Sequence, residues 1–260
     1  MSAGRAALRA EWVKIRTGRS TGWTLVLTFV LCVGLAVLLG LSMRGGFDRM
    51  DAGARANFDP VLVGFYGLLI GEIAFVAFGV LFVGSEYTSG MIRASLTAVP
   101  RRGVFYGAKM LTGALTASVF SLVTGFATFF TAQAALGPHG VTLGSAGALR
   151  ATLLACAHLT LMCLFAMGVA AIARGTALPL GIMIPLLFLD SQGLGNAPGI
   201  RTVAQYLPDQ VGMVMMRAVP ARPDAIDHRA FGPWTGLGVL VLWAAGAVVG
   251  GYLVLRRRDA

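Results

Sequence analysis

The residues with the clearest chemical pattern lie at 84–109, between two of the longest apolar runs of the chain. They follow the spacing E-x3-G-x5-L-x3-P-R-R-x6-K, which is filled by Glu86, Gly90, Leu96, Pro100, Arg101, Arg102 and Lys109. Carboxylates and guanidinium groups at such positions form charge-assisted hydrogen bonds with a charged surface. Charged residues at the ends of this segment are therefore candidates for contact with another protein.

A short helix is expected within this segment. Ile92, Leu96 and Val99 are spaced at i, i+4 and i+7, so they share one helical face. Pro100 ends the helix, because the residue before a proline is pushed out of the α region. A helix with an exposed apolar ridge fits a groove on a partner protein, and Glu86 would pair with an arginine of that partner. The alternative is a solvated loop that only carries an excess of positive charge.

A second pattern lies in residues 1–20, before the first apolar run. Its apolar side chains share one helical face, and charged side chains flank that face: Leu8, Trp12 and Ile15 with Glu11, Lys14 and Arg16. One tryptophan and two aliphatic side chains edged by basic residues are typical of a helix that lies in the headgroup plane of a membrane. The alternative is a basic flank that orients the first span and does nothing else.

Polar side chains also occur inside the apolar runs. Glu72 lies near the centre of the second run, where an ionised carboxylate costs about 3 kcal/mol to insert. It marks either a functional site or a protonated carboxyl group that is hydrogen-bonded to another helix. Thr124 and Thr128 belong to a stripe of hydroxyl groups along the third run, which suits a transport pathway or interhelical contacts. His158, alone in the fourth run, is expected to be a hydrogen-bonded packing residue.

The elements that position these residues are membrane spans. The chain has 260 residues, a mean hydropathy of +0.77 and only 12% charged residues, which excludes an ordinary soluble domain. Six apolar segments predict six transmembrane helices in a single all-α domain over residues 1–260, at 22–43, 61–83, 110–136, 151–173, 177–194 and 234–255. The fifth is expected to be short or broken, because Pro179 and Pro185 interrupt it.

Charge places the connecting segments on two sides of the membrane. The two termini, the segment 84–109 and the turn at Arg174 hold thirteen basic and three acidic residues, whereas the other connections hold eight and seven. The positive-inside rule puts the first group in the cytoplasm, with 190–233 as an extracellular loop that contains a short helix from Pro208. The basic charge reflects this topology and an attraction to anionic lipids, so no nucleic-acid partner is expected.

Small residues are expected to pack the bundle. Gly67 and Gly71 form one G-x-x-x-G motif, and Gly246 and Gly250 form another, so both pairs predict close helix contacts. The three cysteines fall inside spans and predict apolar packing rather than disulfides or a metal site. The sequence contains no G-x-x-x-x-G-K-[ST] phosphate loop, so any ATP that drives this protein is expected to bind another chain.

The pattern at Glu86–Lys109, the N-terminal run EWVKIRTGRS and the final YLVLRRRDA together resemble the ABC-2 type transporter permeases over the whole length of the chain. Met91 departs from that pattern, because the family often has threonine after the glycine. The resemblance implies a bacterial plasma-membrane exporter whose pathway is formed by two permease subunits. A separate ATP-binding subunit would hold ATP and Mg²⁺ and couple through residues 84–102, while this chain itself binds no cofactor or metal and is not an enzyme.

Two other functions are compatible with the same residues. One is a stand-alone secondary transporter that uses Glu72 as a proton carrier. The other is a membrane anchor or sensor subunit that transports nothing.

Overall fold

The computed structural model describes residues 3–17, 19–187, 199, 201–219 and 229–257, and these residues form helices joined by turns and loops. No strand occurs among the residues so described. Two 3-10 turns, Phe47–Arg49 and Gly137–His139, end α2 and α6. In chain order the α-helices are α1 Ala3–Thr17, α2 Arg19–Gly46, α3 Ala52–Ala56, α4 Pro60–Thr88, α5 Met91–Ala98, α6 Arg102–Leu136, α7 Ala148–Ala173, α8 Ala177–Leu187, α9 Arg201–Ala204, α10 Pro208–Met216 and α11 Pro233–Arg257.

Five of these helices are long and apolar enough to cross a bilayer, namely α2, α4, α6, α7 and α11. The all-α membrane fold is therefore confirmed, but six full spans are not. The predicted fifth span, 177–194, contains the 11-residue helix α8, which ends at Leu187, and residues 188–194 lie outside the described part of the chain. Pro185 lies inside α8, where it removes a backbone donor from the helix.

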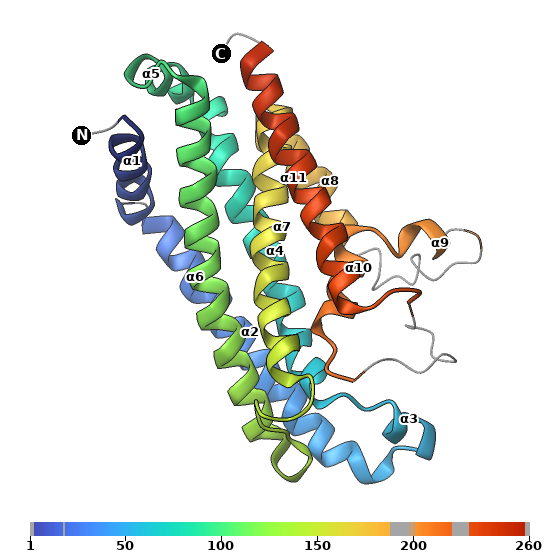
Figure 1. The fold of residues 1–260 in the computed structure, drawn as a ribbon. Helices are drawn as coiled ribbons and strands as arrows, with labels where there is room; N and C mark the ends of the chain where they lie inside the picture. The colour runs from blue at the N-terminus through green and yellow to red at the C-terminus, as the bar shows by residue number, and fades with distance from the viewer. Residues whose placement is uncertain (1–2, 18, 188–198, 200, 220–228, 258–260) are drawn as a thin grey trace.

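The five long helices run along one another, with α7 in the middle of the bundle (Figure 1). α7 packs against α4, α6 and α11, and small side chains on all of them allow this close packing. Both ends of the chain lie at the same end of the bundle as α1 and α5, whereas α3 lies at the opposite end (Figure 1). The expected short helix in the 190–233 segment is present as α10, and it packs against α11, α7 and α4.

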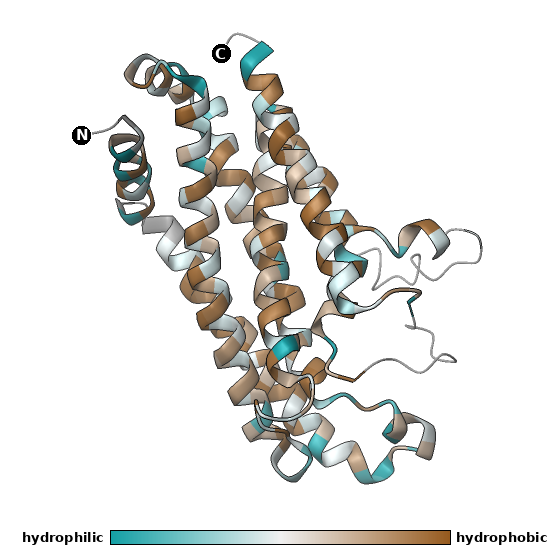
Figure 2. Ribbon diagram, viewed as in Figure 1, coloured by the Kyte–Doolittle hydropathy of each residue, from teal (hydrophilic) through white to brown (hydrophobic). Residues whose placement is uncertain are grey.

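Apolar residues cover the sides of the bundle, and hydrophilic residues gather toward its two ends (Figure 2). Large apolar side chains such as Trp23, Leu38 and Leu242 are exposed on the long helices. In a soluble protein such a surface would aggregate, but here it matches the hydrocarbon interior of a membrane. The chain is therefore a multi-pass membrane protein.

The first G-x-x-x-G motif brings two helices together as predicted. A Cβ on Gly67 would lie 2.5 Å from the carbonyl oxygen of Cys32, and one on Gly71 would lie 2.5 Å from its sulfur atom. α2 can therefore lie against α4 only because these positions lack side chains. All three cysteines are free and buried, which confirms that they pack inside the bundle.

The second motif was only partly predicted correctly. Gly250 contacts Ile172 of α7, but Gly246 has no neighbouring atom within 4 Å of its Cβ position. A closer approach of α7 and α11 is made at Gly168, whose Cβ would lie 2.5 Å from the backbone carbon of Ala247. The G-x-x-x-G pattern does not include Gly168, because the position that Gly168 contacts belongs to the other helix.

A matched pair of substitutions tests this contact. We expect Gly168→Ala to lower the free energy of unfolding by about 1–3 kcal/mol, because α7 and α11 must separate to admit the methyl group. Gly246→Ala adds the same methyl group at an open position, so it should be neutral or stabilise the helix by up to about 1 kcal/mol. Unfolding of the purified protein in detergent measures both. Equal effects of the two substitutions would contradict the assigned α7–α11 contact.

Candidate functional site

Four charged side chains meet where α1, α4 and α6 converge at the end of the bundle that carries both termini. We call Glu11, Lys14, Glu86 and Lys109 the inner-end cluster. The Lys109 Nζ atom lies 2.8 Å from Glu11 Oε2 and 2.9 Å from Glu86 Oε1. The Lys14 Nζ atom lies 2.7 Å from Glu11 Oε1 and 2.6 Å from Glu86 Oε1. The cluster thus joins an N-terminal helix to the facing ends of two membrane spans.

Burial makes this cluster unusual. Lys109 is only 2% exposed, and both carboxylates are buried as well. Burial by itself would raise the pKa of Glu11, but the attraction and hydrogen bonds of Lys109 and Lys14 outweigh it and lower that pKa below its ordinary value. Burial would lower the pKa of Lys14, but its hydrogen bonds to Glu11 and Glu86 raise it instead. Both shifts favour the charged forms of Glu11 and Lys14.

Glu86 has partners within its own chain. Its Oε1 atom accepts hydrogen bonds from Lys14 of its own chain and lies within ion-pair distance of Lys109. The Oε1 atom of Glu86 is therefore paired within its own chain, and the pairing of Glu86 with an arginine of a partner protein stays a prediction. The sequence also placed Glu11 and Lys14 beside the apolar stripe of α1, whereas the structure points both into the cluster.

The apolar stripe predicted on α1 is rotated relative to the buried face of that helix. Trp12 is 48% exposed, and Leu8 and Ile15 are half-buried, while Ala7 and Glu11 face the protein. Arg16 is exposed. α1 packs against α6, where Glu11 reaches Lys109. The exposed Trp12 edge remains compatible with a position in the headgroup region.

The short helix α5 follows the inner-end cluster directly. Gly90 precedes it with a φ of 73°, a left-handed conformation that glycine adopts without steric cost. α5 begins at Met91, so the methionine that departs from the family pattern does not displace the start of the helix. At the other end the helix stops at Ala98, and Pro100 and Arg101 lead into α6.

The apolar ridge of α5 does not face outward. Ile92 is only 5% exposed, and Leu96 and Val99 pack against the hydrophobic core. The prediction of an exposed apolar ridge is therefore wrong, because the ridge binds α5 to its own protein. The surface that α5 presents to the outside is its opposite face, made of small and polar residues with one methionine and one arginine: Met91, Arg93, Ala94, Thr97 and Ala98.

Arg101 and Arg102 have different environments. Arg101 is exposed and precedes the first turn of α6. The Arg102 Nη1 atom donates a hydrogen bond of 2.8 Å to the carbonyl oxygen of Leu255 near the end of α11. Carbonyl groups in the last turn of a helix have no partner within the helix, and a cation there also interacts favourably with the helix dipole. The α5–α6 connection is thus bound to the last helix.

A second polar group is buried in the middle of the bundle. Glu72 Oε1 lies 3.1 Å from His158 Nε2, which joins α4 to α7 and confirms that His158 is a hydrogen-bonded packing residue. Gly212 of α10 lies directly over the imidazole, since a Cβ there would be 2.5 Å from its Cε1 atom. Asp209 lies in the first turn of the same helix, α10. Burial, and to a smaller extent its interaction with Glu72, raise the pKa of Asp209 to about 6.

The hydroxyl stripe of α6 is enclosed by the bundle. Thr124 and Thr128 are fully buried, and neither hydroxyl oxygen has a hydrogen-bond partner among the described residues. One turn away, the hydroxyls of Ser121 and Thr160 lie 3.0 Å apart and connect α6 to α7. This geometry fits interhelical contact better than a water-lined pathway through one copy of the chain.

Asp59 connects two distant segments at the opposite end of the bundle, a contact that no sequence pattern indicated. Asp59 caps α4 by accepting hydrogen bonds from the backbone N–H groups of Val61 and Leu62. Its second oxygen accepts from the N–H groups of Ala218 and Val219, just after α10. An aspartate before a proline is a common helix start, so the cap was recognisable, but the contact with a segment 159 residues away was not.

The chain was compared with known protein families. The family model described as ABC-2 family transporter protein matches residues 7–190, a range that contains all four residues of the inner-end cluster and the whole of α5. No curated protein sequence matches the chain. The match covers well over half of the 260 residues, and it agrees with the bundle of membrane-spanning helices. The chain therefore belongs to the ABC-2 family of transporter proteins, which are permease components of ABC-type transport.

Proposed function

We propose that this protein is the permease subunit of an ATP-driven exporter in a bacterial plasma membrane. Two copies, or one copy and a homologous permease, would enclose the transport pathway. The end of the bundle that carries α1, α5 and both termini would face the cytoplasm, because the excess of arginine and lysine lies there. ATP and Mg²⁺ would be held by a separate ATP-binding subunit, with no cofactor bound by this chain.

The observation that supports this function best is the position of α5 beside the inner-end cluster. α5 is connected to α4 at Gly90 and to α6 through Pro100, and its buried ridge fixes it to the protein. Glu86 lies one helical turn before Gly90 and is paired with lysines of α1 and α6. A displacement of α5 would therefore move three helices together.

Coupling then follows from the mechanics of packed helices. Closure of the ATP-binding subunits would push or pull the exposed face of α5. Because packed helices switch between discrete arrangements rather than deforming continuously, this movement would exchange inward-open and outward-open bundles. The residues proposed to act in this coupling are those at and around α5: Glu86, Gly90, Ile92, Leu96, Pro100, Arg101 and Arg102.

Substitution on the exposed face of α5 tests the docking of the ATP-binding subunit. We expect Ala94→Glu to reduce the amount of ATP-binding subunit that co-purifies with the permease by at least about tenfold. Loss of about 1.4 kcal/mol at the centre of an interface is sufficient for such a change. Ala94 is exposed, so the substitution should leave the folding of the permease unchanged.

Ala56→Glu provides the matched control, because Ala56 is an exposed alanine on α3 at the opposite end of the bundle. It should leave co-purification at the level of the unmodified protein. Loss of the ATP-binding subunit in both variants, or in neither, would be inconsistent with docking at α5.

The contact between Glu72 and His158 favours one alternative enough to require its own test. A proton-coupled transporter would need titratable groups inside the membrane, and Glu72, His158 and Asp209 are such groups. Liposomes that contain only the purified permease decide between the two functions. Cargo movement driven by a pH gradient, without ATP or a second protein, would favour the alternative and overturn the exporter assignment.

A further inference from the structure

A cavity of about 550 Å³ opens beside the inner-end cluster, between α1, α2, α4 and α6. Its volume lies within the range of about 300–1,000 Å³ that small-molecule sites occupy. At one end it is lined by Lys14, Glu86 and Lys109. Farther along α4 from these charges it is lined by Ala77, Phe78 and Leu81, while the ring centroid of Phe82 lies 4.4 Å from the Lys109 Nζ atom. The cavity is therefore polar at one end and apolar at the other.

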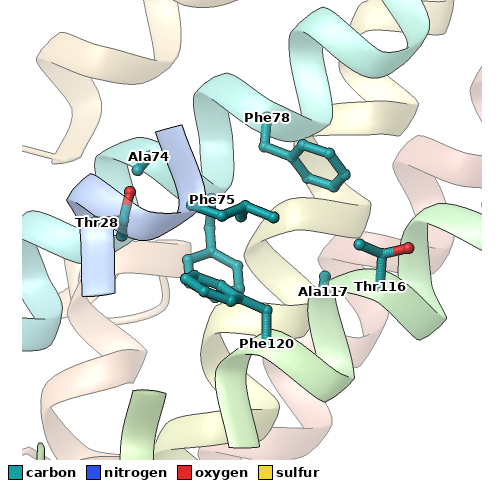
Figure 3. A pocket seen from close by; sticks show the side chains of 8 residues that line it. Thr28, Ala74, Phe75, Phe78, Thr116, Ala117 and Phe120 are labelled. Carbon is teal, nitrogen blue, oxygen red and sulfur yellow. The ribbon is translucent and has the colours of Figure 1, made fainter. Parts of the chain in front are cut away.

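The apolar end leads toward the centre of the membrane. Leu25 and Phe78 line both this cavity and a second, narrow pocket of about 10 Å³ between α2, α4 and α6. In that pocket Phe75 and Phe120 approach each other with ring centroids 5.5 Å apart (Figure 3). These aromatic rings lie at the apolar end of the cavity, the end away from the inner-end cluster. The apolar part of a bound molecule would therefore end near Phe78.

The polar end has one acceptor without a donor. The Oε1 atom of Glu86 is paired with Lys14 and Lys109, whereas its Oε2 atom is buried and has no hydrogen-bond partner among the described residues. Both oxygens of Glu11 are paired with the same two lysines. A buried carboxylate oxygen without a donor is costly, so this position favours a ligand that donates a hydrogen bond.

An ammonium group suits this position better than a neutral donor or an anion. The cavity is lined by Lys14, Lys109 and Glu86, and both lysines already pair with Glu11 and with Glu86 Oε1, so the Oε2 atom of Glu86 is the carboxylate oxygen of the cluster that is left without a donor. A hydrogen bond from an ionised donor to a carboxylate is roughly twice as strong as one between neutral groups. An anion would instead meet Glu86 without a donor of its own.

We propose that this cavity binds an amphiphile with a primary ammonium head, held at Glu86 Oε2, and a short apolar chain that lies against Leu81, Phe82 and Phe78. The ligand enters from the cytoplasmic leaflet, because the cavity lies at the end of the bundle that carries the termini. This binding goes beyond the proposed function, since it requires neither ATP nor the ATP-binding subunit. Its failure would leave the exporter assignment intact.

Binding is tested on the purified full-length protein in a neutral detergent, with dodecylamine as the probe. Dodecanol and dodecyl phosphate have the same chain with a neutral and an anionic head. We expect dodecylamine to bind at least about tenfold more tightly than either, which corresponds to about 1.4 kcal/mol. Native mass spectrometry counts the bound molecules. Equal binding of the three probes, or a preference for the phosphate, would overturn the proposal.

Two substitutions and one control locate the site. Ala77 lines the cavity without touching the inner-end cluster, so Ala77→Trp should fill the cavity and reduce dodecylamine binding at least about tenfold. Ile70→Trp on the same helix is the control, because Ile70 is exposed on the bundle surface and does not line the cavity. Glu86→Gln should remove the preference for the amine over dodecanol. Undiminished binding in Ala77→Trp would show that the probe binds elsewhere.

A further experiment identifies whether the natural ligand is a membrane lipid or a diffusible amine. The protein is reconstituted in bilayers that contain phosphatidylethanolamine and phosphatidylcholine in equal amounts, and the lipid retained after extraction is analysed. Enrichment of phosphatidylethanolamine assigns the site to a membrane lipid. Binding of dodecylamine without that enrichment assigns it to a diffusible amine, and the absence of both contradicts the proposed site.

Discussion

Replacing Lys109 by methionine should lower the free energy of unfolding by about 3–5 kcal/mol, the largest loss expected for any single substitution considered. Its ammonium group faces Glu11 and Glu86 at 2.8 and 2.9 Å inside the protein. Removal of one partner from a buried ion pair leaves the opposite charges without compensation, and this cost exceeds the value of the pair itself. Methionine keeps most of the volume, so the loss would come from charge rather than from a cavity.

Lys14→Met is the matched control for burial. Lys14 contacts the same two carboxylates, but its side chain is 34% exposed against 3% for Lys109. Water can replace part of its interactions, so the loss should be no more than about 1 kcal/mol. The double variant Lys109→Met with Glu11→Gln should recover part of the stability, because it removes one of the stranded charges. Equal losses for the two lysines would contradict the assigned cluster.

The dependence of stability on pH provides a second measurement of the same cluster. The native pKa of Glu11 is lowered, so the native state binds fewer protons than the unfolded state at mildly acidic pH. The stabilisation from Glu11 is therefore present above the ordinary glutamate pKa and is lost as the pH falls through the lowered native pKa. In Lys109→Met this acid-dependent loss should shrink, because the main cause of the lowered pKa is removed.

Asp59→Ala should give the second largest effect, a loss of about 3 kcal/mol. Four backbone N–H groups lose their acceptor at once, two in the first turn of α4 and two just after α10. Loss of a helix cap costs about 0.5–2 kcal/mol, and hydrogen bonds to a charged group contribute about 1.5–3 kcal/mol. Unfolding in detergent measures the loss, and amide hydrogen exchange should show faster exchange at Ala218 and Val219.

Asp51→Ala serves as the comparison. Asp51 also caps a helix, but it accepts one N–H group, that of Ala54, at an exposed position in α3. Its replacement should cost about 1 kcal/mol or less. If both substitutions had the same effect, Asp59 would be only a local cap and the contact between α4 and the segment after α10 would be unimportant.

The sequence predicted the spans and the family pattern well because both depend on local composition. Long apolar runs identify α2, α4, α6, α7 and α11 directly, since a membrane requires about 20 apolar residues for each crossing. The short helix between α4 and α6 was also predictable, from the glycine before it and the proline after it. The interruption of the fifth run by Pro179 and Pro185 likewise predicted the shortness of α8.

The sequence did not predict which face of a helix points inward when both faces carry mixed residues. On α5 the apolar ridge was assigned to a partner protein, but Ile92 packs against the same chain. On α1 the stripe through Trp12 was assigned to the headgroup plane of the membrane, but the pattern did not show that Glu11 is the residue that faces the protein. In both cases periodicity identifies an apolar face without identifying what covers it.

Polar contacts between distant segments were the least predictable feature. Glu11 and Lys109 are separated by 98 positions in the chain, and no local pattern connects them. The positive-inside count treated both as topological signals on the cytoplasmic side, although the pair is buried in the protein. Asp209 lies in the short helix predicted from Pro208 in the loop 190–233, and the sequence did not show that packing of α10 on α7 and α4 brings it close to Glu72.

The hydrogen bond from Arg102 to Leu255 has a mechanical consequence for the opposite side of the membrane. α11 has 25 residues and is about 37 Å long at 1.5 Å per residue. Arg102 binds this helix near its C-terminal end, so a movement of α6 would tilt the whole of α11. A tilt of only about 5° would displace its far end by about 3 Å over that length. Trp243, near the middle of the helix and about 18 Å from Leu255, donates a hydrogen bond to the carbonyl oxygen of Tyr206, so the same tilt would also move the segment between α9 and α10, by about 1.6 Å.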